Sequence, residues 1–215
     1  MIIKKHIYLS IRILLTLSMF FVGIFFYNNL PNIIPIHWNI NGQIDRYSPK
    51  NIAIFIFPII TLIMVIILRL SQYIDPKKAR YETFKKEWEI MQTVITAFMV
   101  YIYFIIIYLS LNQSQKIEPL LFIGMGALFI IIGNYLGKIR QNYMIGFKLP
   151  WTIANEDVWN KTNRLGGYMF VIFGIIFLLE AYFLWNSAYV IFLFMLLVIF
   201  VPIIYSYLLY KKIKK

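Results

Sequence analysis

Apolar residues fill long, continuous runs in this 215-residue chain, and shorter polar segments separate them. Each run is about 20 residues long, the helical length that crosses a hydrocarbon core of about 30 Å at 1.5 Å per residue. Because the runs are continuously apolar rather than alternating, they predict helices and not the strands of a transmembrane barrel. The pattern predicts six spanning helices, at residues 7–27, 52–70, 90–111, 120–136, 167–185 and 188–210.

This pattern predicts an all-α fold, a polytopic bundle of six transmembrane helices with a small extracellular β-hairpin loop and an interfacial cytoplasmic segment. No repeat, low-complexity tract or long linker divides the sequence, so we expect a single integral membrane domain at residues 1–215. Residues 1–111 would hold the first three helices with the outer hairpin loop at 28–50. Residues 112–215 would hold the last three helices with a cytoplasmic motif loop at 138–166.

Lysine and arginine are unevenly distributed between the polar segments. Of the 21 basic residues, all but Arg46, Lys50 and Lys116 lie near the N-terminus, after the second helix, after the fourth helix, or in the C-terminal tail. Cytoplasmic loops carry an excess of these residues, so both termini are expected to be cytoplasmic. Arg12, at the start of the first helix, is expected to extend toward the inner interface.

The formal net charge of +12 does not alter the prediction of a membrane protein. In a soluble chain it would suggest nucleic-acid binding, but here it is spread over one membrane face, where it attracts anionic membrane lipids. We therefore expect bacterial membrane lipids as partners and no direct contact with nucleic acid. With no cysteine and 2 histidines, the chain offers neither thiol chemistry nor a full set of metal ligands. The sequence predicts no catalytic residue, metal or cofactor.

The outer loop has the pattern of a small hairpin. A short alternating run at 36–40 precedes Asn41-Gly42, the pair that best supplies the positive φ angles of a two-residue turn, and residues 43–47 can return as the second strand. Ser48 then stands before a proline, which predicts that it caps the second helix.

Several polar and aromatic residues of this loop are candidate contacts. His37 and Asp45 would lie on facing strands, but one histidine and one carboxylate make neither a zinc site nor a catalytic triad. We favour a cross-strand polar pair, with Trp38 anchored at the membrane interface. Asn39 and Gly42 complete the set near the turn.

The loop after the second helix carries Tyr81, Phe84 and Trp88 at spacings of three and four. This spacing predicts an amphipathic extension of the third helix that lies at the lipid headgroups. A docking site for a soluble partner is the alternative.

The motif loop is dense in tryptophan, proline and glycine. Asn155 is a candidate N-cap for a short interfacial helix, with Trp151 and Trp159 at the lipid boundary. This composition indicates a fixed shape rather than a flexible connector. The loop is either an element that orients the fifth helix or a recognition surface, and the sequence leaves both open.

Within this loop the chain resembles the SdpI family of bacterial peptide-toxin immunity membrane proteins. The resemblance rests on the motif Asn142-x-x-Ile145-Gly146-x-Lys148-x-Pro150-Trp151-Thr152, followed by Trp159 and Asn163-Arg164. The outer run Ile34-Pro35-Ile36-His37-Trp38-Asn39 with Gly42 resembles the membrane domain that commonly precedes that motif. Lys148 stands where the family usually has arginine, and a lysine lacks the planar fork of a guanidinium.

This resemblance implies a multi-pass protein of the bacterial cell membrane that protects a cell against a secreted, membrane-active toxic peptide. It also implies a signalling role, in which the toxin-occupied protein holds a cytoplasmic transcriptional repressor. The expected peptide-binding residues in the outer loop are His37, Trp38, Asn39, Gly42 and Asp45. The expected cytoplasmic motif residues are Asn142, Gly146, Lys148, Pro150, Trp151, Trp159, Asn163 and Arg164.

Few polar residues interrupt the apolar runs. Glu180 is the only carboxylate inside a predicted span, which makes it a functional candidate, although near the interface it can also reach the headgroups. Asn134 is expected to form an interhelical hydrogen bond, and Gly133 with Gly137 suits close helix packing.

Two further functions are less well supported. A transporter or channel of small solutes or ions would need several intramembrane polar groups or matching broken helices, and only Glu180 and Asn134 qualify. A membrane-embedded enzyme would need a converging nucleophile and base, so it ranks last.

Overall fold

The computed structural model describes residues 3–39, 42–112, 117–183 and 188–213. Asn41, Lys116 and the predicted end of the fifth span at 184–185 lie outside these ranges. In chain order the elements are α1 (Ile3–Phe25), β1 (Ile33–Trp38), β2 (Ile44–Pro49), α2 (Lys50–Ile74), the 3-10 helix η1 (Lys78–Thr83), α3 (Lys85–Leu111), α4 (Glu118–Leu136), α5 (Pro150–Ala154), α6 (Glu156–Phe183) and α7 (Ala188–Ile213).

Six of the described helices are long and apolar enough to cross a membrane, namely α1, α2, α3, α4, α6 and α7. Each spanning helix bonds its own backbone polar groups, which lipid cannot do. The prediction of a multi-pass, all-α bundle with a small hairpin is therefore confirmed, and the protein is a membrane protein.

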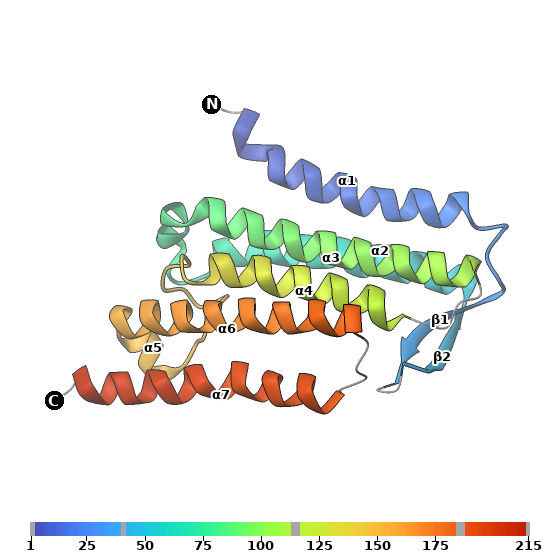
Figure 1. Cartoon of the computed structure of the whole chain (residues 1–215). Helices are drawn as coiled ribbons and strands as arrows, with labels where there is room; N and C mark the ends of the chain where they lie inside the picture. The colour runs from blue at the N-terminus through green and yellow to red at the C-terminus, as the bar shows by residue number, and fades with distance from the viewer. Residues whose placement is uncertain (1–2, 40–41, 113–116, 184–187, 214–215) are drawn as a thin grey trace.

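The spanning helices lie side by side, with the β1–β2 hairpin at one end of the bundle (Figure 1). Both chain ends lie at the opposite end, together with η1 and α5 (Figure 1). We call these the hairpin end and the termini end. An even number of spans brings the two chain ends to the same side.

One part of the core forms between α1, α2 and α3. Its centre holds Met19, Ile54, Val100 and Tyr103, all buried. Ile34 of β1 is also buried in this cluster. The hairpin is therefore packed onto the helix ends by an apolar anchor, rather than extending freely from them.

The helices α4 and α6 approach each other at pairs of glycines. A Cβ atom added at Gly133 would lie 2.6 Å from the carbonyl oxygen of Gly167, and one at Gly174 would lie 2.7 Å from that of Gly126. Side chains would force these backbones apart, so small residues allow close packing within the membrane. The predicted packing role of Gly133 is confirmed.

The hairpin differs in detail from the sequence prediction. Its strands are antiparallel, but the Asn39 N–H donates to the Gln43 carbonyl at 2.8 Å, so the turn is longer than two residues. Gly42 has a φ of +71°, the left-handed conformation that glycine adopts without a steric penalty. Ser48 does not cap α2: it pairs with Ile34 within the sheet. The strand continues to the start of the helix and leaves no capping position for Ser48.

The short helix of the motif loop also lies elsewhere than predicted. It is α5, which precedes Asn155 and has Pro150 at its first position. The Asn155 side chain does accept a hydrogen bond from the Val158 N–H at 3.0 Å, as an N-cap does. However, the helix that it caps is the spanning helix α6 itself, which begins well before the apolar run.

Candidate functional site

Two of the five outer-loop candidates form an exposed pair. His37 of β1 and Asp45 of β2 are both exposed, and His37 Nδ1 lies 2.5 Å from Asp45 Oδ1. This is the cross-strand polar pair favoured from the sequence. Tyr47 and Ile33, which the sequence did not single out, also expose large apolar side chains on this hairpin. The outward surface of the hairpin is thus a mixture of charged, polar and apolar groups.

The other three candidates support the hairpin. Asn39 accepts a hydrogen bond from the Gln43 N–H at 3.0 Å, and Gly42 supplies the left-handed turn residue. Trp38 is half-buried and packs against Leu109 and Ile117, near the ends of α3 and α4. These residues hold the shape of the surface on which His37 lies.

In the motif loop, two buried asparagines organise the backbone. The Asn142 side chain accepts hydrogen bonds from the N–H groups of Met144 and Ile145, both at 2.8 Å. The Asn163 side chain accepts from the Phe147 N–H at 3.0 Å and donates to the Trp159 carbonyl. Buried backbone groups need such partners, so these side chains define the path of the loop.

Gly146 is fixed by the same contacts. Its φ is +115°, and an added Cβ atom would lie 2.6 Å from Asn163 Oδ1 and 2.9 Å from the Trp159 ring. Both the backbone conformation and the lack of space require glycine.

The Trp159 side chain is fully buried and donates to the Ile139 carbonyl at 2.9 Å. It belongs to the same apolar cluster as Tyr81, Phe84 and Trp88, which are buried as well. The expected interfacial positions of these four side chains are therefore wrong. A helical apolar stripe can face lipid or protein, and here the motif loop covers it.

A third group of contacts connects the motif loop to α7. The Thr152 hydroxyl accepts a hydrogen bond from the Leu149 N–H at 2.8 Å, next to Pro150 at the start of α5. The Trp151 indole donates to the Ser206 hydroxyl of α7 at 2.7 Å. Trp151 thus attaches the last spanning helix to the loop.

The buried Asp75 carboxylate joins the two loops of the termini end. It accepts hydrogen bonds from the Tyr81 hydroxyl and from the Tyr143 N–H, both at 2.9 Å. Burial, together with this carboxylate, raises the pKa of Tyr81 above its usual range. Arg80 and Glu156 add an ion pair of 3.0 Å between the same two loops.

Lys77 completes this junction by donating to the Gln141 side chain. Burial lowers the pKa of Lys77, and the neighbouring Arg80 lowers it further.

The remaining motif residues, Lys148 and Arg164, are exposed. The Lys148 ammonium donates to the Met144 carbonyl at 3.0 Å, so it closes its own turn. Most of the motif therefore has a structural role, and its exposed cations are the part left to contact other molecules.

The structure also reveals a buried charge cluster that sequence reasoning missed. Arg12 of α1 is 0 % exposed, and its Nη2 lies 2.8 Å from Glu89 Oε2 on α3. Arg69 of α2 reaches the other carboxylate oxygen at 2.9 Å. The expectation that Arg12 extends to the interface is thus wrong, since its partner lies within the bundle. Glu180 is not the only carboxylate in a spanning helix, because Glu89 lies in α3.

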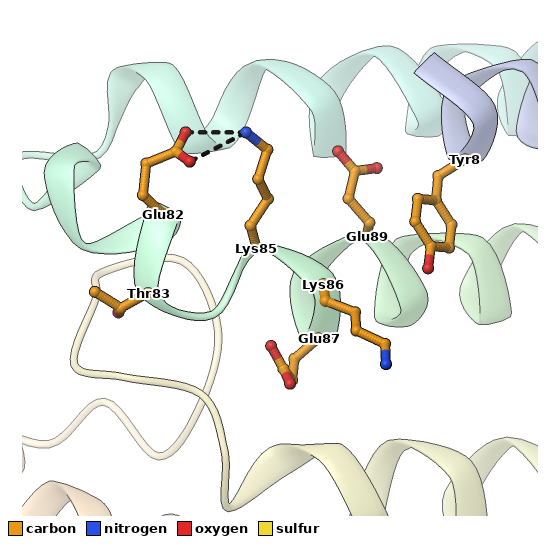
Figure 2. A pocket seen from close by; sticks show the side chains of 7 residues that line it. All are labelled: Tyr8, Glu82, Thr83, Lys85, Lys86, Glu87 and Glu89. Carbon is orange, nitrogen blue, oxygen red and sulfur yellow. Dashed lines mark hydrogen bonds and ion pairs between the residues drawn. The ribbon is translucent and has the colours of Figure 1, made fainter. Parts of the chain in front are cut away.

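A cavity of about 380 Å³ opens beside this cluster. Tyr8 of α1 and residues of the η1–α3 segment, including Glu82, Lys85 and Glu89, line it (Figure 2). Lys85 and Glu82 form an ion pair of 3.0 Å at its rim (Figure 2). Glu89 therefore belongs both to the helix interface and to a cavity at the termini end.

The two polar residues predicted within the membrane differ in their surroundings. Glu180 is buried in α6. Asn134 is exposed and donates to the Ile130 carbonyl of its own helix at 2.8 Å, so the expected interhelical bond is absent. Across the described ranges, no group of three or more histidine or acidic side chains is placed to hold a metal ion.

A known protein resembles the chain along nearly its whole length. It is 28% identical over 216 residues to the "Immunity protein SdpI" of Bacillus subtilis (strain 168), and the match covers 98% of each chain. No solved structure matches it. Residues 14–62, which include the hairpin, match a domain of unknown function, DUF1648. The family resemblance expected from the motif is confirmed: residues 138–206 match the model of the SdpI/YfhL protein family.

Proposed function

We propose that this chain is a membrane immunity protein that gives a bacterial cell resistance to a secreted, membrane-active toxic peptide. The observation that carries the proposal is the end-to-end match to the Bacillus subtilis "Immunity protein SdpI", with 98% of both chains covered. The six spanning helices agree with an action at the membrane, where such a peptide would be met.

In this proposal the termini end faces the cytoplasm and the hairpin end faces outward. The distribution of lysine and arginine supports this orientation, because the basic loops flank the termini end. A tag inserted after Asn41 should be accessible to an impermeant label from outside intact cells, and a C-terminal tag should not. The reverse pattern would exclude contact between a secreted peptide and the hairpin.

The hairpin surface is the proposed contact for the peptide. His37 and Asp45 offer exposed charge and hydrogen bonding, and Tyr47 offers an exposed aromatic ring. Trp38, Asn39 and Gly42 would act by fixing the strand and turn beneath them. An apolar anchor such as Ile34 keeps this surface in one place relative to the helix ends.

A signalling role is a further part of the proposal. The exposed cations Lys148 and Arg164 of the motif loop are available to a cytoplasmic transcriptional repressor. If the protein holds a repressor when the peptide is bound, toxin addition should derepress a reporter only in cells that contain both proteins. Removal of both cations should abolish that response while resistance persists.

The central test is resistance itself. The chain is expressed in a sensitive bacterium, candidate secreted peptides are added, and survival is compared with that of cells expressing an unrelated six-span protein at equal abundance. Survival should rise for at least one peptide. Unchanged survival across a broad panel would contradict the proposal.

Transport of a small solute or ion is the alternative, and it predicts flux. Liposomes containing the chain should show no more solute or ion flux than protein-free liposomes. Flux that a Glu180→Gln variant abolishes would favour a transporter.

A further inference from the structure

A second cavity at the termini end, of about 210 Å³, lies between the end of α4 and the first turns of α6. It is lined by Gly137, Arg140, Asp157, Asn160, Lys161 and Arg164. Gly137 allows the approach of the two segments, since an added Cβ atom would lie 3.1 Å from the Arg164 Cα atom. This approach brings Arg140, three residues further along, to the same cavity as Arg164.

The cavity carries an excess of positive charge. Arg140, Lys161 and Arg164 are exposed cations, and none forms an ion pair with a described residue. Asp157 is the single carboxylate among the lining residues, so it leaves a formal excess of two positive charges. Elsewhere in the described chain, Arg12, Arg69 and Arg80 are paired with carboxylates. The cations of this cavity lack such partners.

The types of cation indicate which anion fits. A guanidinium presents N–H groups in a rigid fork that matches two oxygens of a phosphate, whereas an ammonium acts as a point charge. Arg140 and Arg164 supply two such forks, and Lys161 adds a third charge. The cavity is smaller than the roughly 300 Å³ at which sites for drug-sized ligands begin, so it suits a headgroup-sized fragment.

The depth of the cavity indicates where that phosphate comes from. The spanning helix α4 ends at Leu136, and the apolar run of α6 begins at about Gly167, three residues after Arg164. The cavity therefore lies at the edge of the apolar spans, the level at which lipid headgroups lie. A lipid phosphate bound at this depth would leave the acyl chains free to extend along α4 and α6.

We propose that the cavity formed by Arg140, Lys161 and Arg164 binds the phosphodiester of an anionic membrane lipid at the termini end of the bundle. This site is distinct from the hairpin surface and does not depend on resistance to the peptide, although it shares Arg164 with the proposed repressor contact. A bound lipid would compensate the excess charge between α4 and α6, and would thereby stabilise the attachment of the motif loop to the membrane.

The test measures lipid binding to the full-length protein in detergent by native mass spectrometry, with phosphatidylglycerol as the probe. The variant Arg140→Gln/Arg164→Gln should bind it at least about tenfold more weakly, because the loss of even one charge-assisted hydrogen bond has that effect. The matched control, Lys78→Gln/Lys86→Gln, removes two exposed cations from the same end outside the cavity and should change binding less than about twofold. Asp157→Asn removes the opposing charge and should strengthen binding, which keeps the test decisive if the arginine variant does not fold.

Three outcomes would overturn the proposal. Equal losses of phosphatidylglycerol affinity in the two double variants would mean that the positive charge of this end attracts the lipid without a specific site. Equal affinity for phosphatidylcholine would mean that the net charge of the lipid is not recognised. Competition by glycerol 1-phosphate as effective as that by phosphatidylglycerol would assign the cavity to a soluble phosphate compound.

Discussion

The hairpin and the motif loop use similar residues for different purposes. Each contains asparagine, tryptophan and one glycine with positive φ, Gly42 in the hairpin and Gly146 in the motif loop. In the hairpin, His37 and Asp45 are exposed and bond to each other. In the motif loop, Asn163 is buried and bonds to the backbone. A motif that identifies a family can therefore be largely structural, while a less distinctive exposed loop is free to contact other molecules.

The buried charge cluster of Arg12, Arg69 and Glu89 should contribute strongly to stability, as the buried residues of the motif loop do. Glu89→Gln leaves the buried Arg12 and the half-buried Arg69 without their anion, so the free energy of unfolding should fall by about 3–5 kcal/mol. Glu87→Gln, in the first turn of the same helix, is the control and should cost less than about 1 kcal/mol. Unfolding in mixed detergent micelles measures the loss of free energy in each variant. Equal losses would mean that the Glu89 carboxylate contributes no more to stability than that of Glu87.

The two glycines provide a matched pair. Gly146→Ala should lower the free energy of unfolding by about 3 kcal/mol, because both φ and space exclude a Cβ atom there. Gly42→Ala should cost about 1 kcal/mol, since its φ is left-handed and the side chain that it would meet, Glu118, can rotate away. Similar losses of unfolding free energy in the two variants would mean that the motif loop does not require its glycine more strictly than the hairpin does.

Tyr81 predicts a pH dependence of stability at the contact between its own loop and the motif loop. Its pKa is raised in the folded state by burial and by Asp75, so its stabilising contribution is complete below the ordinary tyrosine value near 10 and decreases above it. Above about pH 10, stability should fall by up to about 1.4 kcal/mol per pH unit. In Tyr81→Phe this part of the slope should disappear. A titration with the same slope in both proteins would contradict this assignment.

The smallest effect on stability should come from the hairpin surface. The His37–Asp45 pair is exposed, and such pairs contribute between about 0 and 1 kcal/mol. His37→Ala should therefore leave the free energy of unfolding within about 1 kcal/mol of the parent value. A larger loss would mean that the pair holds the hairpin together, and that the two regions do not differ as described.

The helices and the hairpin could be predicted because their signals are local. An apolar run of sufficient length satisfies its own backbone in lipid wherever its neighbours lie. The outer strands likewise follow from an alternating run next to a glycine turn. The exact turn was missed, because the pairing of Asn39 with Gln43 depends on register rather than on the identity of the turn residues.

The buried partners could not be predicted, because they come from distant parts of the chain. Arg12 and Glu89 each lie near the edge of an apolar run, where charged residues usually face the headgroups. The spacing of Tyr81, Phe84 and Trp88 is the same whether lipid or protein covers them. Asp75 joins the two loops because it bonds to Tyr143, which lies 68 positions away, as well as to the nearby Tyr81.

We propose that the exposed surface of the hairpin confers resistance while the rest of the chain supports it. The most direct measurement compares the survival of sensitive cells that express the parent chain with those that express His37→Ala/Asp45→Ala/Tyr47→Ala, with both proteins at the same membrane abundance. The variant should lose most of the protection against the peptide that the parent resists. Full protection by the variant at equal abundance would contradict it.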